Sequence, residues 1–164
     1  MDVLYATYAD YLTGVASRYI RQPDNLHDVM QEAFIKVFTS IQDFEYRGKG
    51  SLKAWLTRVV INEALIFLRQ NKRLNETDID ALPDMPEEEP PDTSGLTPEQ
   101  AKALIDQLPD GYRAVFNLYA IEGKSHKEIA ELLHIKPDTS ASQYHRAKNM
   151  LARIIRQQYN QPTR

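Results

Sequence analysis

The middle of the 164-residue chain is a stretch that is poorly suited to forming a packed core. Between Asn75 and Glu99 there are nine acidic residues and no basic residue, and the same stretch holds five of the nine prolines. Like charges repel, proline removes amide donors, and few apolar side chains are present, so we predict a flexible acidic linker over residues 74–96. The chain then divides into two small folded parts, residues 1–73 and 97–164. The linker is either a plain spacer or a polyanion that occupies a basic channel built for nucleic acid.

Acidic and basic residues are concentrated in different segments of the chain. The net charge is −3 at pH 7, and leaving out the nine acids between Asn75 and Glu99 changes it to +6. Between Asp24 and Glu45 there are five acids and one base, whereas between Arg47 and Arg73 there are seven bases and one acid. From Asp138 to the end there are five bases and one acid. Charges separated in this way indicate different partners for different segments.

Several classes of protein are disfavoured by what the sequence lacks. There is no cysteine, which excludes disulfides, thiolate metal sites and cysteine nucleophiles. No apolar run approaches the roughly 20 residues of a membrane span, and the N-terminus has no signal pattern, so we expect a cytoplasmic protein without membrane insertion. The four histidines are scattered, and Asp78, Asp80 and Asp84 lack the spacing of a calcium loop. We therefore expect no enzyme, no metal site and no cofactor.

Apolar residues of the first part recur at steps of three and four, which is typical of amphipathic helices. One helix is predicted over about 4–19, and a second carries its apolar face over 29–41. The glycine-containing loop FEYRGKGS follows, and Ser51 is expected to cap a third, long helix. Trp55 falls on the apolar stripe of that helix, so we assign it to the core rather than to base stacking.

The second part is also predicted to be helical, which makes the whole chain all-α. Thr97 with Gln100 has the spacing of a capping box, and so has Ser125 with Glu128. Helices are expected after each box, and another is expected over about 111–121.

The end of the chain has the features of a helix-turn-helix. Small Ala130 permits close approach of two helices, the turn HIKP follows, and a last helix is predicted over about 138–158. The apolar seam of this last helix is narrow and is expected at Ser140, Tyr144, Ala147, Leu151 and Ile154 or Ile155. A wide polar face remains over its first three turns.

A polar face of this kind suits the major groove of DNA. Amide, hydroxyl and guanidinium groups can address base edges, and cations can hold phosphates. The predicted contacts on the last helix are Thr139, Ser142, Gln143, Arg146 and Lys148. Ser125 and Lys127, at the start of the preceding helix, are expected to hold phosphates. The competing interpretation is a surface helix that is merely solvated.

Four motifs together resemble one family. DVMQEAFIKVF, WLTRVVINEALIFLR, LPDGYRAVFNLYAIEGKSHKEIAELL and TSASQYHRAKNML are similar to segments of the extracytoplasmic-function (ECF) group of sigma-70 RNA polymerase sigma factors. They occur in the family's order, with a variable linker between the two folded parts. The resemblance implies a subunit that directs core polymerase to promoters and helps open the −10 region. In these terms residues 1–73 correspond to sigma region 2 and residues 97–164 to sigma region 4, which reads the −35 element.

The resemblance also implies how the chain meets polymerase. The DVMQEAF segment matches the region that docks on the clamp coiled coil of the largest subunit, and the flap is a further expected contact. The candidate residues are Asp28, Gln31, Glu32 and Phe34. An acidic helix with apolar neighbours suits a basic helical partner, although an ordinary amphipathic helix with a solvated acidic side would look the same. An anti-sigma factor that covers these surfaces is implied by the family as well.

The loop FEYRGKGS and the helix after it match the family's reader of the −10 element. In the family this loop captures a base that flips out of the non-template strand. We expect Phe44 and Tyr46 to form the wall of that pocket and cations to hold the phosphates of the strand. The predicted strand contacts are Phe44, Tyr46, Lys49, Arg58, Asn62, Arg69 and Arg73.

Three positions depart from the family pattern. His134 stands where glycine is usual, so a left-handed turn of a non-glycine residue is expected there. Ala141 stands where lysine is frequent, and Ile66 where some members have asparagine. Because of these three differences, the preferred promoter sequence is not predicted from the resemblance. A second reading also stays open, namely a free-standing helix-turn-helix regulator that binds its operator without polymerase.

Overall fold

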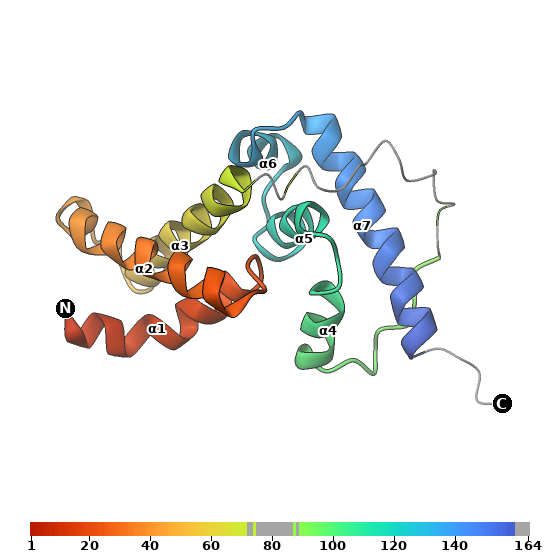
Figure 1. Ribbon diagram of the computed structural model, residues 1–164, viewed down its shortest axis with the longest axis horizontal. Coiled ribbons are helices and arrows are strands. Elements are labelled where there is room, and N and C mark those ends of the chain that lie inside the picture. The colour runs from red at the N-terminus through yellow and green to blue at the C-terminus, as the bar shows by residue number, and fades with distance from the viewer. Residues whose placement is uncertain (72–73, 75–86, 88, 160–164) are drawn as a thin grey trace. The chain divides into compact units, whose positions relative to one another are not determined.

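The computed structural model shows a helical protein (Figure 1). The residues that it describes are 1–71, 74, 87 and 89–159. Within these ranges there is no strand, which confirms the all-α prediction. The chain divides into two compact units, which we call unit 1 (Met1–Asn71) and unit 2 (Lys72–Arg164). Most of the predicted linker over 74–96 lies outside the described residues.

Unit 1 is a bundle of three helices. They are α1 (Asp2–Ser17), α2 (Pro23–Ser40) and α3 (Ser51–Gln70), with a 3-10 turn, η1 (Ile41–Asp43), after α2. Each helix contacts the other two, because each has an apolar face that recurs at three- and four-residue steps. The core of the bundle includes Leu12, Val15, Ala33, Val37, Leu56, Val60, Ala64 and Leu68, all nearly inaccessible to solvent.

An ion pair joins α2 to α3. The Lys36 ammonium pairs with the Glu63 carboxylate, and the side chains are 50% and 8% exposed, respectively. A buried carboxylate requires a partner, and removing the lysine would leave the charge of Glu63 uncompensated. The pair therefore fixes the two helices against each other.

Ser51 does not cap α3, contrary to the prediction. The N-cap is Gly50, whose left-handed backbone (φ 88°) a side-chain-bearing residue adopts only with strain. The Ser51 hydroxyl instead donates to the Gly48 carbonyl at 2.8 Å and accepts from the Arg47 amide at 3.2 Å. Ser51 thus holds the loop in front of α3 rather than the end of the helix.

The described residues of unit 2 form four α-helices and one π-helical turn. In chain order they are α4 (Pro98–Ile105), α5 (Asp110–Phe116), η3 (Asn117–Ile121), α6 (His126–Leu133) and α7 (Pro137–Gln158). The region predicted as one helix over 111–121 is therefore an α-helix that widens into a π-turn. The Glu122 amide donates to the Asn117 carbonyl, five residues back, at 3.0 Å.

Both predicted capping boxes are confirmed. The Thr97 hydroxyl accepts from the Gln100 amide at 3.2 Å, and the Gln100 side chain accepts from the Thr97 amide at 2.9 Å. Ser125 and Glu128 exchange the same two bonds at 3.1 and 2.8 Å. These bonds satisfy amide groups that have no partner within the helix, and they fix where α4 and α6 begin.

The core of unit 2 forms between α4, α5 and α7. Its buried members are Leu104, Leu108, Tyr112, Ala147, Leu151 and Ile155. Arg113 on α5 is completely buried beside them. Its guanidinium donates to the Leu108 carbonyl at 2.7 Å and pairs with the Asp110 carboxylate.

Part of the predicted linker is described and contacts α7. The Arg156 guanidinium donates to the Glu89 carbonyl. The Ser94 amide donates to the Asp92 carboxylate at 2.9 Å, and this hydrogen bond lowers the pKa of Asp92 below its ordinary value. Both interpretations of the linker remain compatible with these contacts.

The turn between α6 and α7 has the expected left-handed residue. His134 has φ 54° and ψ 46°, and the Ile135 amide donates to the Ala130 carbonyl at 3.0 Å. This bond closes the end of α6, and the left-handed residue directs the chain into α7.

Replacing His134 by glycine is expected to stabilise unit 2 by about 1 kcal/mol. A side-chain-bearing residue is strained in the left-handed region, and relief of this strain exceeds the entropy that glycine adds to the unfolded chain. Urea unfolding followed by circular dichroism measures the gain. Equal or lower stability of the glycine variant would contradict the expectation.

Candidate nucleic-acid interface

A pocket of about 280 Å³ lies where the loop after η1 meets α3. Its lining residues are Asp43, Phe44, Glu45, Arg47, Ser51, Ala54, Trp55 and Arg58. The rings of Phe44 and Trp55 have centroids 5.5 Å apart and form an apolar wall, and Arg58 supplies a guanidinium group from α3. An unstacked nucleotide has a base with apolar faces and a charged phosphate, so this combination suits capture of one base of a single strand.

The wall of this pocket differs from the predicted one. Tyr46 is 75% exposed and does not line the pocket, so its assignment to the wall is wrong. Trp55, which was assigned to the core, is half-buried and faces the pocket instead. The reason is that Trp55 packs on Phe44 from the α3 side and fills the place expected for Tyr46.

The other predicted strand contacts lie on α3 or in the loop before it. Lys49, Arg58 and Asn62 are exposed, and Arg69 is half-buried. Arg73 lies outside the described residues. The pocket residues Asp43, Glu45, Arg47, Ser51 and Ala54 were not among the predicted contacts. No periodic signal marks them, since they come from η1, the loop after it and the first turn of α3, which only the fold brings together.

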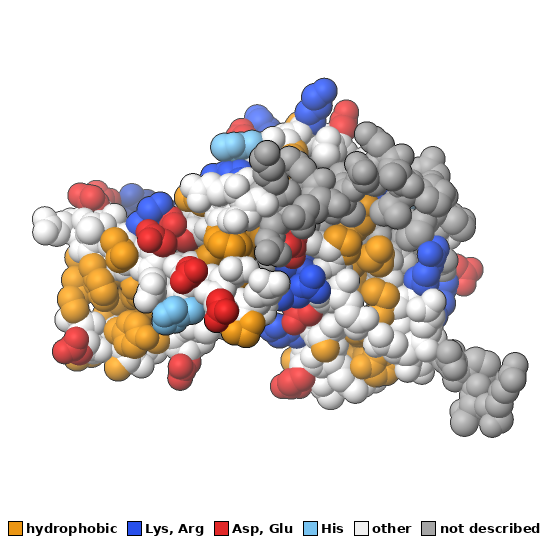
Figure 2. All heavy atoms as spheres, in the orientation of Figure 1, with side chains coloured by type: hydrophobic (Ala, Val, Ile, Leu, Met, Phe, Trp, Pro, Cys, Tyr) orange, Lys and Arg blue, Asp and Glu red, His pale blue; other side chains and the backbone are white. Residues whose placement is uncertain are grey.

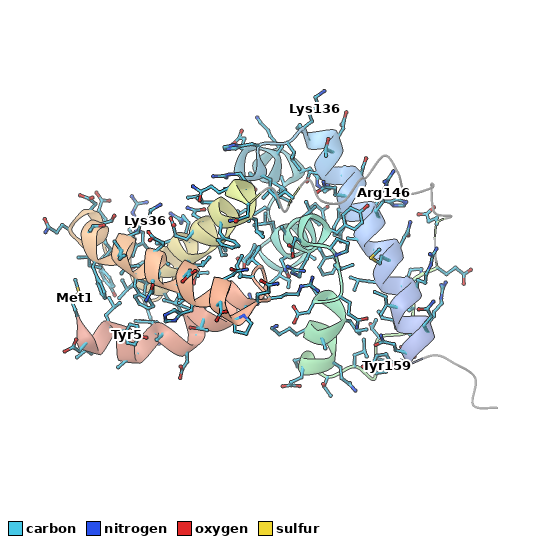
Figure 3. All side chains as sticks on the ribbon, viewed as in Figure 1. Met1, Tyr5, Lys36, Lys136, Arg146 and Tyr159 are labelled. Atoms are coloured by element: carbon cyan, nitrogen blue, oxygen red, sulfur yellow. The ribbon has the colours of Figure 1, made fainter. Side chains whose placement is uncertain are left out.

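A larger apolar groove lies on the α1 and α2 side of unit 1. Its volume is about 670 Å³. It is lined by Tyr5, Thr13, Pro23, Leu26, His27, Met30, Gln31, Phe34, Ile35 and Phe38. Figure 2 shows apolar side chains gathered over these two helices, with acidic side chains and a histidine nearby. Tyr5, labelled on α1 in Figure 3, and Ile35 are each 54% exposed.

The predicted polymerase contacts fall on or beside this groove. Gln31 lines it and is exposed, and Asp28 and Glu32 are exposed on the same helix. Phe34 is only 7% exposed because its ring packs against Tyr5 at 4.8 Å, so it forms the groove without protruding. Tyr5 was not predicted, since it lies on a different helix and only the fold brings it to Phe34.

The helix-turn-helix consists of α6 and α7. Ser125, Lys127, Ser142 and Lys148 are exposed. Thr139 and Arg146 are half-buried. Figure 3 shows Lys136 at the N-terminal end of α7 and Arg146 farther along the helix.

Gln143 does not lie on the exposed face, contrary to the prediction. It is 4% exposed, because the buried side of α7 runs through Ser140, Gln143 and Ala147. Tyr144, predicted at that place in the seam, is half-buried at its edge. A side chain enclosed in this way cannot reach a base, so Gln143 is withdrawn from the candidate DNA contacts.

Ser125 is committed to the capping box. Its amide donates to the Glu128 carboxylate at 2.8 Å, so a phosphate would have to displace this bond to reach the amide. Lys127 is the cation at this helix start, and it is exposed.

An aromatic cluster packs η3, α6 and α7 together. The His126 and Tyr119 rings are stacked at 4.5 Å, and the Tyr119 and Tyr144 rings are 4.4 Å apart. The Lys148 ammonium lies 5.1 Å from the centre of the Tyr144 ring. Burial raises the pKa of Tyr144, with Tyr119 adding to the rise, so the phenol remains protonated at neutral pH.

The described parts of the chain hold neither a group of metal-ligating side chains nor a helix fit to cross a membrane. In residues 1–71, 74, 87 and 89–159, no three His, Asp or Glu side chains are grouped so that they could hold a metal ion. No helix in those same ranges is long and apolar enough to cross a membrane. Asp78, Asp80 and Asp84 lie outside them.

Each unit of the chain matches a known protein family. Residues 4–74 match the family description "Sigma-70 region 2", and residues 98–151 match "Sigma-70, region 4". The ECF RNA polymerase sigma-E factor of Haemophilus influenzae is 29% identical, over 94% of this chain and 86% of the relative. The ECF sigma factor SigE of Mycolicibacterium smegmatis is 32% identical, over 92% of this chain and 59% of the relative.

A solved structure has the same fold. It is the sigma factor RpoE of Bartonella quintana in complex with the anti-sigma factor NepR. The TM-score is 0.55 at 21% identity, and the match covers 94% of this chain and 96% of that one. With sigma-70 regions 2 and 4 in order over most of the chain and ECF sigma factors among its relatives, the chain belongs to the ECF group of the sigma-70 family and is an RNA polymerase sigma factor.

Proposed function

We propose that unit 1 attaches this sigma factor to core polymerase and captures a base of the opened −10 element, while unit 2 reads the −35 element. The observation that carries the proposal is that unit 1 holds two different sites. One is an apolar groove beside acidic residues, and the other is a base-sized pocket supplied with guanidinium groups. A free-standing regulator has no use for the second site.

The groove suits the clamp coiled coil of the polymerase largest subunit. Tyr5 and Ile35 offer exposed apolar area, and Asp28 and Glu32 add negative charge on the same side of α2. A basic amphipathic helix would cover the exposed apolar area with its apolar face and pair its cations with the two carboxylates. An anti-sigma factor, such as the one bound to the Bartonella protein, would block polymerase by covering this groove. The flap remains a further proposed contact.

The pocket suits a base of the non-template strand. Stacking of a base on an aromatic side chain contributes about 1–3 kcal/mol, which offsets the few kcal/mol of unstacking. Phe44 and Trp55 supply this wall, while Arg58 and Lys49 attract the strand. The proposed contacts farther along α3 are Asn62 and Arg69.

Unit 2 would place the start of α7 in the major groove of the −35 element. Thr139, Ser142 and Arg146 are the proposed base or phosphate contacts, with Lys148 and Lys127 on phosphates. Polymerase forms the bonds, so we propose no chemistry for this chain itself. Its place of action is where polymerase works, in the cytoplasm.

Run-off transcription tests the function directly. Purified chain and core polymerase are incubated with genomic fragments, and initiation at discrete sites is expected only when both are present. A gel-shift comparison separates the alternative, because a free-standing regulator would bind tightly without polymerase. Failure to associate with core polymerase, or association without initiation, would refute the proposal.

Reversing one acidic charge beside the groove should weaken polymerase binding. Glu32→Lys is expected to lower the affinity for core polymerase about tenfold at low salt, with a smaller effect at high salt. Asp10→Lys, on an exposed part of α1 that does not line the groove, makes the same change of net charge and should have little effect. Equal losses in the two variants would point to net charge instead of this surface.

A further inference from the structure

We infer that His126 is a positioning residue for the −35 reader, because its hydrogen bond to Ser140 holds the start of α6 against the start of α7. The inference rests on the proposed function of unit 2. His126 does not touch DNA in this account. It acts through the helices that carry the DNA contacts.

The bond joins two segments that are distant in sequence. His126 Nδ1 and Ser140 Oγ are 2.9 Å apart, and Ser140 is completely buried. A buried hydroxyl requires a partner, since leaving it without one is unfavourable. The imidazole is the partner that the structure provides, so the packing of α7 on α6 is tied to the position of this ring.

The His126 ring is held by the aromatic cluster. It stacks on Tyr119 at 4.5 Å with an angle of 11° between the planes, and Tyr144 lies 6.0 Å away. Tyr119 and Tyr144 in turn contact each other at 4.4 Å. Tyr119 therefore lies between the imidazole and Tyr144, and its stack on the imidazole limits the freedom of Nδ1 to leave Ser140.

The chain neighbours of the bonded pair are the proposed DNA contacts. Lys127 follows His126, and Thr139 precedes Ser140. Phosphate contacts determine where a reader lies on the duplex, and base contacts determine which sequence it prefers. A site of this kind must be held to within about 0.5 Å, so a loosened link between the two helices should reduce base discrimination first.

The test uses holoenzyme and a probe that the protein itself selects. The probe is a promoter fragment recovered by run-off transcription with the wild-type holoenzyme. A second DNA fragment is identical except for a scrambled −35 element. The ratio of the two dissociation constants measures discrimination. Four variants are compared: Ser140→Ala, His126→Phe, His126→Asn and, as a control on the exposed side of α6, Glu131→Ala.

Ser140→Ala and His126→Phe should each reduce the discrimination ratio about fivefold to tenfold, the usual effect of one buried hydrogen bond. Binding to the scrambled fragment and to core polymerase should change less than about twofold, because phosphate and polymerase contacts remain. His126→Asn keeps a polar group near the place of Nδ1 and should retain most of the ratio. The double variant His126→Phe with Ser140→Ala should be no worse than either single variant.

Several results would overturn the inference. One is an unchanged ratio in His126→Phe and Ser140→Ala, and another is additive losses in the double variant. An asparagine variant as poor as the phenylalanine variant would show that the hydrogen bond is not the cause. If the wild-type holoenzyme recovers no promoter at all, the proposed function fails instead, which is a distinguishable outcome.

Discussion

Replacing Arg113 by alanine is expected to destabilise unit 2 by about 3–5 kcal/mol, enough to unfold much of it at 37 °C. Arg113 is completely buried, donates to the Leu108 carbonyl and pairs with the Asp110 carboxylate, which is 11% exposed. The truncation removes the Arg113 donor from that carboxylate and that carbonyl, which lie in a largely buried place. It also opens a cavity beside the core of α4, α5 and α7.

The unfolding of the two units can be followed by different spectroscopic signals. Its single tryptophan, Trp55, lies in unit 1, so fluorescence follows the unfolding of unit 1 while circular dichroism follows both units. Arg113→Ala should shift the dichroism transition and leave the fluorescence transition in place. Lys102→Ala is the matched control, since its pair with Asp106 is much more exposed (46% and 29%) and should contribute less than about 1 kcal/mol. Equal effects of the two substitutions would show that the burial of Arg113 is irrelevant.

Replacing Phe44 by alanine is expected to weaken the binding of holoenzyme to a single-stranded −10 oligonucleotide about tenfold or more. Phe44 forms the apolar wall of the pocket with Trp55, and one base stacked on an aromatic ring contributes about 1–3 kcal/mol. Open complexes on duplex promoters should decline in parallel, as measured by 2-aminopurine fluorescence along the non-template strand.

Two controls tie this loss to base capture. Tyr46→Ala removes an aromatic residue from the same loop, but Tyr46 is 75% exposed and outside the pocket, so it should have a small effect. A strand with an abasic site at the captured position should bind wild type and Phe44→Ala equally, because there is no base to stack. A loss that persists on the abasic strand would place the role of Phe44 in the folding of the loop.

The sequence predicted best those features that depend on neighbours along the chain. The two capping boxes were predicted from spacing and residue type, because their partners lie three residues apart. The helical class followed from periodicity for the same reason. The left-handed backbone of His134 was expected from the glycine that the family usually has at that position. The apolar faces were mostly placed correctly, since each helix must bury one side.

The misses concern contacts between elements. Gln143 and Tyr144 are adjacent on α7 and differ by about 100° in direction, so only the helices packed against α7 determine which one is buried. The polar Gln143 was assigned to the surface on polarity, and the structure encloses it. Tyr46 was predicted in the pocket wall and Trp55 in the core, whereas Trp55 lines the pocket and Tyr46 does not. The cause is similar, because the Ser51 hydroxyl holds the path of the loop, which no local sequence pattern predicts.

The ion pair between Lys36 and Glu63 has a consequence for how the molecule approaches its partners. Lys36 is the only base between Asp24 and Glu45, and Glu63 is the only acid between Arg47 and Arg73. Because these two minority charges neutralise each other, the side of α2 presents an almost purely negative field and α3 an almost purely positive one. The negative field of α2 should raise the association rate with a cationic protein, and the positive field of α3 should raise that with a polyanionic strand. Both rate increases should decline together as ionic strength rises.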